Sequence, residues 1–253
     1  MNREAFLNLL TRAVKDGHLT EREASDLLRQ FDRGELDVDE ANAPLDPSEA
    51  ITPLTDADVQ RAVSVLLLLG TLSYLHLRRA HFREVLQDRF IAGARGLAKA
   101  KASGRVSLSA WQQGMREQIR SNIVQNVAIG SGRVPAANAL QAAVSVQEAY
   151  LARWADELAV KALLGEPTSE LGMIARAALY AGAGRAEGYR AEAELYPEGG
   201  AVTYTAVDDS GTCQACLDAE GTYRVTDPFP VPGAVCAGYG NCRCTLEFNE
   251  VAA

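Results

Sequence analysis

Residues 213–248 read CQACLDAEGTYRVTDPFPVPGAVCAGYGNCRCTLEF, and they hold every cysteine of the 253-residue chain. The five thiols follow the spacing C-x2-C, nineteen residues, C-x5-C-x-C, at Cys213, Cys216, Cys236, Cys242 and Cys244. Because the first 212 residues contain no cysteine, we expect these thiols to share one role. The clustering predicts a small cysteine-dependent module near the C-terminal end.

Zinc sites and redox-active thiols both use such spacings. A structural zinc site takes two cysteines from a tight turn and two from a later turn, which together form a tetrahedron. Reactive cysteines, disulfides and inert buried thiols are the alternatives. The N-terminal sequence MNREAFLNLLTRAV carries charges at Arg3 and Glu4 and has no long apolar core, so it does not resemble a secretory signal. Disulfides rarely persist in a reducing cytosol, which favours structural zinc.

The spacing also suggests which thiols bind the metal. Cys213 and Cys216 form one half of the site, and Cys236 and Cys242 form the second half. Cys242 and Cys244 are alternate residues, so a strand at this point would direct them to opposite faces. One of them would then be a ligand and the other a packing residue. We predict Cys213, Cys216, Cys236 and Cys242 as ligands, with Cys244 as the alternative fourth ligand.

The segment TYTAVDDSGTCQACLDAEGTYRV, the prolines after it and the NCRCTL ending resemble the C-terminal signature of the phage Mu F-like minor head proteins. These are also called phage head morphogenesis proteins. Their signature joins an Asp-rich lead-in, C-x2-C, a downstream Asp and Gly, prolines and a final His-Pro-x-Cys-Arg-Cys. Matching positions in this chain are Asp208, Asp209, Cys213, Cys216, Gly221, Pro230, Pro232, Asn241, Cys242, Arg243 and Cys244.

The chain departs from this signature at one metal-binding position. Tyr239 stands where the signature has its histidine, and Gly240 replaces the proline. Tyrosine is a poor zinc ligand, so Cys236 is expected to supply the missing donor. Upstream, a Trp-containing helix, a polar turn and an Arg-Ala-x-x-Tyr helix that leads into the cysteine module resemble the middle of the same family.

The resemblance implies a structural protein of the virion without enzymatic activity, present in the host cytoplasm during assembly. Such a protein binds the portal or the inner capsid during head assembly or DNA packaging and ejection. The implied partners are the portal protein and capsid or scaffold proteins, with self-association through the helices. The implied cofactor is structural Zn²⁺.

Charge is distributed unevenly along the chain. The net charge is −8, which argues against a general nucleic-acid-binding protein. Residues 61–133 nevertheless hold twelve basic and three acidic residues, between two acidic segments. This basic region can pair with acidic parts of the same chain, with an acidic partner or weakly with DNA, or it can line the outer faces of helices.

Two other function classes are alternatives to a structural role. A zinc-dependent enzyme would use an open coordination position with Asp208 or Asp209 as base, but H-E-x-x-H and similar patterns are absent. A DNA-binding zinc module would need basic residues, and residues 199–253 hold only Arg224 and Arg243 against seven acids.

The remaining sequence predicts a mainly α fold: a helical body of long helices with a small C-terminal α+β zinc-binding module. We divide the chain into a helical hairpin arm at 1–38, a proline-rich linker at 39–54, the helical body at 55–198 and the zinc module at 199–253. Residues 62–77 are strongly apolar but only about sixteen long. A membrane span needs about twenty, so we expect no membrane span.

Capping signals and apolar spacing define the individual elements. Thr20 with Glu23, Thr55 with Asp58, and Ser109 with Gln112 are expected helix caps, and one helix is expected to run from residue 55 to near Gly104. A strand is expected over 201–207, where side chains alternate. The expected core stripes are Trp111, Met115, Ile119, Ile123 and Val127 in one helix and Val146, Tyr150, Trp154 and Leu158 in the next.

Overall fold

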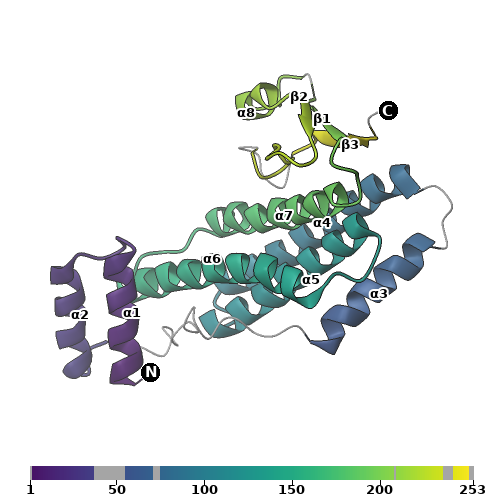
Figure 1. The fold of residues 1–253 in the computed structure, drawn as a ribbon. Coiled ribbons are helices and arrows are strands. Elements are labelled where there is room, and N and C mark those ends of the chain that lie inside the picture. Colours follow the sequence, from purple (N-terminus) through teal and green to yellow (C-terminus); the bar gives the residue numbers. More distant parts are fainter. Residues whose placement is uncertain (1, 37–54, 71–74, 208, 236–241, 251–253) are drawn as a thin grey trace. The chain divides into compact units, whose positions relative to one another are not determined.

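The protein is mainly helical, with one small sheet near its C-terminal end (Figure 1). Its structure is a computed structural model that describes residues 2–36, 55–70, 75–207, 209–235 and 242–250. The described helices are α1 (Arg3–Lys15), α2 (Glu21–Asp32), α3 (Asp56–Gly70), α4 (Leu75–Ala102), α5 (Leu108–Ser131), α6 (Ala137–Leu163), α7 (Glu170–Ala193) and α8 (Gln214–Asp218). The described strands are β1 (Ala201–Thr205), β2 (Gly221–Arg224) and β3 (Thr245–Asn249). The predicted fold class is confirmed.

The sheet is built around β1, the strand that the alternating sequence predicted. Its order is β2-β1-β3, and both neighbours run antiparallel to β1. Val202 and Tyr204 point to the covered face and are fully buried, whereas the residues between them are more exposed. Tyr204 lies opposite Gly221 on one side and Leu246 on the other. The pleat thus directs the Tyr204 side chain into the interior of the module.

Contacts divide the chain into two compact units, and both draw on the long helices. The first comprises residues 1–52, 95–117 and 145–174, and the second comprises 53–94, 118–144 and 175–253. Each of α4, α5, α6 and α7 therefore contributes one segment to each unit. The predicted linker 39–54 lies outside the described residues. The division into arm, body and module stays a prediction.

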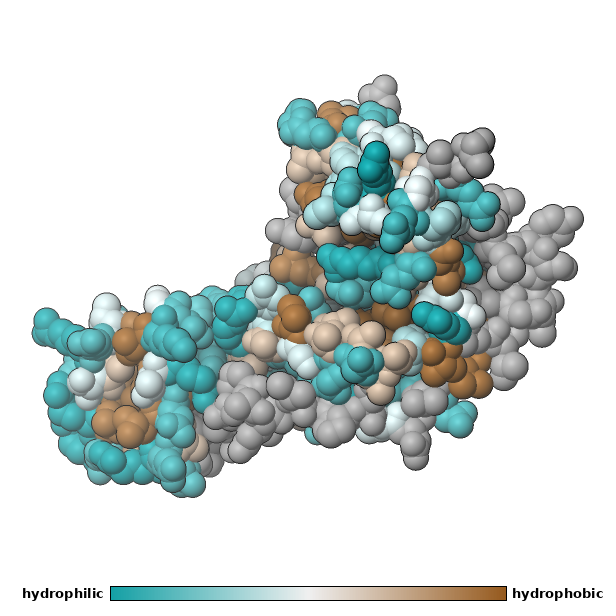
Figure 2. Space-filling model, viewed as in Figure 1, coloured by the Kyte–Doolittle hydropathy of each residue, from teal (hydrophilic) through white to brown (hydrophobic). Residues whose placement is uncertain are grey.

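The N-terminal hairpin forms as its capping signals predict. Thr20 accepts a hydrogen bond from the Glu23 amide, and the Glu23 carboxylate accepts one from the Thr20 amide at 2.8 Å. Gly17, with φ of +75°, provides the left-handed turn after α1. In Figure 2, hydrophobic surface gathers between the two helices on the visible face of the hairpin.

The hairpin packs on the C-terminal half of α6 within the first unit. Phe6 stacks on Phe31 with ring centroids 4.4 Å apart, and Val160 joins their apolar cluster. Arg12 donates to the buried Asp156 carboxylate at 2.7 Å. Of the two docking sites expected for the hairpin, a partner or the main body, the structure shows the second.

The expected continuous helix after residue 55 is wrong, because the structure has two helices there. Val65 of α3 packs in one cluster with Phe82 and Leu86 of α4. In a single straight helix, residues 65 and 86 would lie about 31 Å apart at 1.5 Å per residue. The cap at Thr55 and Asp58 is confirmed, with the Thr55 amide donating to the Asp58 carboxylate at 2.9 Å. None of the described helices is long and apolar enough to cross a membrane.

The predicted core stripe of α5 is confirmed: all five of its residues are buried. The helix is capped by Ser107, whose hydroxyl accepts from the Ala110 amide, rather than by Ser109. The predicted stripe of α6 is half wrong. Trp154 and Leu158 are buried, but Val146 and Tyr150 are 52% and 51% exposed. A helix can carry apolar residues outside its buried face, and tertiary packing decides which of them are covered.

Small residues of α7 bring this helix close to α5 within the second unit. A Cβ added at Gly184 would come 2.1 Å from the Asn122 side-chain nitrogen. One added at Gly130 would come 1.9 Å from the Gly188 carbonyl oxygen. The expectation that the alanine and glycine face of this helix permits close helix packing is confirmed.

Candidate metal centre

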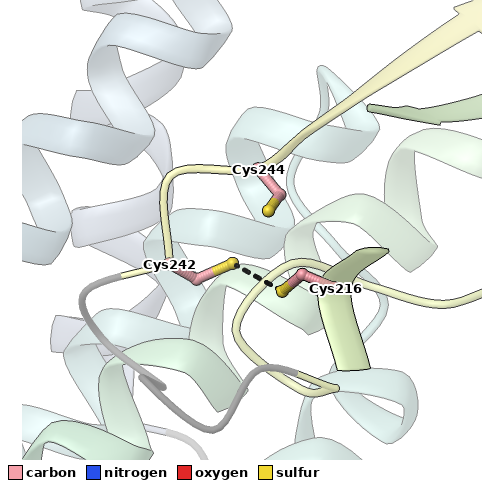
Figure 3. A group of neighbouring side chains, drawn as sticks. All are labelled: Cys216, Cys242 and Cys244. Carbon is pink, nitrogen blue, oxygen red and sulfur yellow. Dashed lines mark hydrogen bonds between the residues drawn. The ribbon is translucent and has the colours of Figure 1, made fainter. Parts of the chain in front are cut away.

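Three cysteine sulfurs converge in the C-terminal module. The Sγ atoms of Cys216, Cys242 and Cys244 all lie within 4.8 Å of one another, and the three residues are buried (Figure 3). Cys216 Sγ and Cys242 Sγ are 3.9 Å apart. No disulfide joins the described cysteines. This buried group, which we call the thiol cluster, could hold a metal ion.

The spacing of the sulfurs suits a tetrahedral thiolate site. With zinc–sulfur bonds of about 2.3 Å, two sulfurs of a tetrahedron lie about 3.8 Å apart. The Cys216–Cys242 separation of 3.9 Å is close to this value. Thiolate donors select soft or borderline ions such as Zn²⁺. The donor set and its geometry therefore fit the predicted cofactor class.

Two different pieces of backbone supply the thiol cluster. Cys216 lies in the short helix α8, whose N-cap is Cys213, and the amides of Cys216 and Leu217 both donate to the Cys213 carbonyl. Cys242 and Cys244 come from the irregular segment that precedes β3. Because this segment is not a strand, the alternation argument for opposite faces fails. Both sulfurs point to the same site, as Figure 3 shows.

The predicted ligands are only partly brought together. Cys216 and Cys242 belong to the thiol cluster, and so does Cys244, the alternative ligand. Cys213 is half-buried and packs against the cluster's residues, although its sulfur is not one of the three. Cys236 lies outside the described residues, as does Tyr239.

Tyr204 is a further polar group at the thiol cluster. Its fully buried hydroxyl donates to Cys216 Sγ at 3.3 Å. Burial raises the pKa of Tyr204 well above its usual value, and the hydrogen bonds to Cys216 and Cys244 raise it further. The phenol is therefore held as a proton donor to the sulfurs. The alternating sequence predicted the strand that carries Tyr204, but it did not predict the contact of Tyr204 with the cysteines.

Hydrogen bonds also favour the charged form of one thiol. Burial by itself disfavours the Cys244 thiolate, yet bonds from the Val207 backbone, the Tyr204 hydroxyl and the neighbouring thiols together hold its pKa below the usual value. A thiolate is the form that binds metal. The surroundings of Cys244, predicted only as the alternative ligand, thus favour the ligand form.

The side chain of Arg185 in α7 binds the backbone of the segment that holds Cys242 and Cys244. Its guanidinium donates to the Cys242 carbonyl at 2.8 Å and to the Cys244 carbonyl at 3.0 Å. A third bond, at 3.3 Å, reaches the Tyr189 hydroxyl. Arg185 and Tyr189 belong to one of the two Arg-Ala-x-x-Tyr patterns of α7, at 176–180 and 185–189, but no feature of the sequence connects this pattern with the cysteines.

The candidate catalytic base of the enzyme hypothesis is engaged in an ion pair. Asp209 accepts from Arg243 at 2.7 Å and from the Gly211 amide at 2.9 Å. Chiefly because of the Arg243 bond, the pKa of Asp209 lies below its usual range, which makes it a weak base. Arg243 lies between Cys242 and Cys244, so this ion pair links the loop that contains Asp209 to the cysteine segment before β3. Asp208 lies outside the described residues.

Several residues of the basic region 61–133 pair with carboxylates of the same chain. The described part of the region includes five arginines that make ion pairs with Asp58, Glu148 or Glu192: Arg61, Arg79, Arg83, Arg116 and Arg120. Self-pairing therefore accounts for part of the local excess of positive charge.

Comparisons of the chain with protein-family models, with curated proteins and with solved structures found no match.

Proposed function

We propose that this chain is a phage minor head protein, in which a structural Zn²⁺ closes the C-terminal module on a helical body. The observation that carries the proposal is the buried thiol cluster of Cys216, Cys242 and Cys244. It falls within the cysteine motif that resembles the phage head morphogenesis proteins. The protein would act in the virion by binding the portal or the inner capsid.

A structural role for the metal follows from the size of the module. Its sheet has three strands of four or five residues, and such a small sheet buries too little apolar surface to be stable alone. Metal binding contributes directly to the folding free energy of small modules of this kind. Because the three sulfurs are buried, a bound ion would be shielded from substrate, as in closed structural sites.

Elemental analysis of the purified protein and of single Cys→Ser variants tests the metal centre. We expect one zinc per chain in the wild type, and loss of zinc in the variants of Cys216, Cys242 and Cys244. Cys213→Ser and Cys236→Ser compare the two candidates for the fourth ligand, and the variant that retains zinc identifies the non-ligand. A wild-type protein without zinc, or full retention in Cys242→Ser, would contradict the proposal.

Assembly partners require a separate experiment. We expect the chain to co-purify with the portal ring or with capsid or scaffold proteins in a reconstituted head, and to do so less after zinc removal. Weak DNA contact through 61–133 would appear as binding that falls steeply with salt concentration. If the zinc-loaded protein fails to associate with any head component, the head-assembly role is wrong even though the metal centre stands.

A further inference from the structure

Arg185 is a buried cation at the edge of the thiol cluster. Only 8% of the residue is exposed, and its two terminal nitrogens donate to the carbonyls of Cys242 and Cys244. Gln87 accepts a longer bond at 3.4 Å, and Tyr189 accepts one at 3.3 Å. The Nε atom is buried without a hydrogen-bond partner among the described residues. The guanidinium fork thus spans the backbone of two residues of the thiol cluster.

Arg185 differs from the other buried arginines of its unit in having no carboxylate among its described hydrogen-bond partners. Arg83 pairs with Glu192 at 2.7 Å, and Arg120 pairs with Asp58 at 3.0 Å. The partners of Arg185 within the described residues are carbonyl, amide and hydroxyl oxygens, which are neutral. A buried charge without an opposite charge is strongly unfavourable. The carboxylate of the exposed Glu84 acts on Arg185 only through a longer-range charge interaction, so a buried anion close to the guanidinium would stabilise it further.

A metal–thiolate centre would supply that anion. Zn²⁺ bound by three thiolates has a net charge of roughly −1, and by four thiolates roughly −2. Such a centre is itself unfavourable in a buried site unless positive charge or hydrogen-bond donors surround it. The positive charge of Arg185 and the negative charge of a metal–thiolate centre would therefore stabilise each other across the backbone of Cys242–Cys244.

We infer that Arg185 is a positioning residue of the metal centre: it fixes the backbone that presents Cys242 and Cys244 and neutralises the charge of the metal–thiolate group. This inference rests on the proposed zinc centre. If it holds, metal binding by the cysteines depends on the position of α7, the helix that carries Arg185. On the same helix, Tyr189 stacks under Arg83 at 4.2 Å, and Arg83 pairs with Glu192, so the contacts of Arg185 continue to α4 within the second unit.

Zinc affinity of three full-length variants tests the role of Arg185. Arg185→Met removes the charge and the fork, Arg185→Lys keeps the charge alone, and Arg190→Met is the matched control on the same helix, where an exposed arginine pairs with Glu187. By competition with a chromophoric chelator, we expect Arg185→Met to weaken zinc binding by about 10- to 100-fold, as for other residues that support metal ligands. Arg185→Lys should lie between Arg185→Met and the wild type, and Arg190→Met should match the wild type.

Substitution by Co²⁺ separates a positioning role from general destabilisation. We expect the thiolate-to-cobalt charge-transfer band to change in Arg185→Met and Arg185→Lys but not in Arg190→Met. If Arg185→Met does not fold, Arg185→Lys decides: wild-type affinity and an unchanged band would overturn the inference. Wild-type zinc affinity and an unchanged band in a folded Arg185→Met would also overturn the inference, but the proposed zinc centre would stand.

Alkylation rates of the cysteine thiols test Arg185 even if the wild type binds no metal. That result would contradict the proposed function itself, and alkylation rates of the metal-free proteins would then test Arg185 alone. We expect Cys242 and Cys244 to react at least about tenfold faster in Arg185→Met than in the wild type, because the segment loses both of its fork hydrogen bonds. Equal rates would show that Arg185 does not position this backbone.

Discussion

Tyr204 shows how a single residue connects the sheet with the thiol cluster. Tyr204→Phe keeps the buried ring but removes the hydroxyl that donates to Cys216 at 3.3 Å. Because hydrogen bonds to charged groups contribute about 1.5–3 kcal/mol, we expect a loss of that order in the unfolding free energy of the zinc-loaded protein. The Co²⁺–thiolate band should also shift, since the sulfur loses its donor. Chemical denaturation and absorption spectroscopy measure the two effects.

Tyr223→Phe is the matched control for this prediction. Its hydroxyl donates to the Ala219 carbonyl at 2.8 Å and not to a sulfur. We expect it to lower stability by about 1 kcal/mol, as for a neutral hydrogen bond, and to leave the cobalt band unchanged. Identical bands in Tyr204→Phe and the wild type would show that the hydroxyl does not act on the metal-binding sulfurs.

At this scale, the sequence predicted which residues are chemically active but not what surrounds them. The restriction of cysteine to residues 213–244 predicted a shared site because its evidence is local. Arg185 and Cys242 are 57 residues apart, so their contact depends on how α7 packs against the module. The placing of both Cys242 and Cys244 at one site was missed because alternation applies only within a strand, and β3 begins at Thr245.

Among the helices, the start of α3 combines a local cap with a tertiary ion pair. The buried Asp58 accepts from Thr55 within the cap and from Arg120 of α5 at 3.0 Å. Burial disfavours the charged carboxylate, but these hydrogen bonds outweigh it and hold the pKa of Asp58 below its usual value near 4. The folded state therefore gains stability from the ionised carboxylate above about pH 4, and loses it as the pH falls through the depressed pKa.

Asp58→Asn tests this linkage. We expect the variant to lose about 3 kcal/mol at pH 7, because Arg120 loses its ion pair with the buried Asp58, and to lose less than the wild type on acidification from pH 4 to pH 2. Urea unfolding at several pH values measures both. The exposed pair Asp26 and Arg29 provides the control, and Asp26→Asn should change stability by less than about 1 kcal/mol. Parallel pH profiles for Asp58→Asn and the wild type would refute the assignment.

The close approach of α5 and α7 makes a second prediction for the helices. In Gly130→Ala the new methyl group would meet the Gly188 carbonyl oxygen, which is backbone and cannot rotate away. We expect a loss of about 2–3 kcal/mol from overpacking. Gly96→Ala in α4 meets nothing within 4 Å, so it should be neutral or stabilising by up to about 1 kcal/mol. Thermal unfolding compares them, and equal stabilities would mean that the helices separate at little cost.

Two of the three expected caps were predicted correctly because their signals span only a few residues. Thr20 with Glu23 and Thr55 with Asp58 both form the expected caps. The division between α3 and α4 was not predictable from periodicity, since apolar residues continue through it. The exposed Val146 and Tyr150 show the same limit: a helix can have several apolar stripes, and only tertiary packing decides which one is buried.

For the whole molecule, two compact units raise the question of whether they unfold together. The first unit contains both tryptophans of the chain, Trp111 and Trp154, in edge-to-face contact at 4.7 Å. The thiol cluster lies in the second unit. Tryptophan fluorescence therefore reports on the first unit, and the metal centre reports on the second. This separation allows the energetic coupling between them to be measured without any mutation.

We expect zinc removal to destabilise the second unit selectively. At free zinc of 100 times the dissociation constant, bound metal stabilises the folded state by about 2.7 kcal/mol, and a chelator removes this contribution. Hydrogen exchange of β1 and β3 should accelerate after chelation, whereas the thermal transition seen by tryptophan fluorescence should hardly move. The competing expectation comes from α4, α5, α6 and α7, each of which contributes to both units and could transmit the loss. An equal downward shift of both transitions would show that these helices couple the units into one cooperative structure, and that the metal stabilises the entire chain.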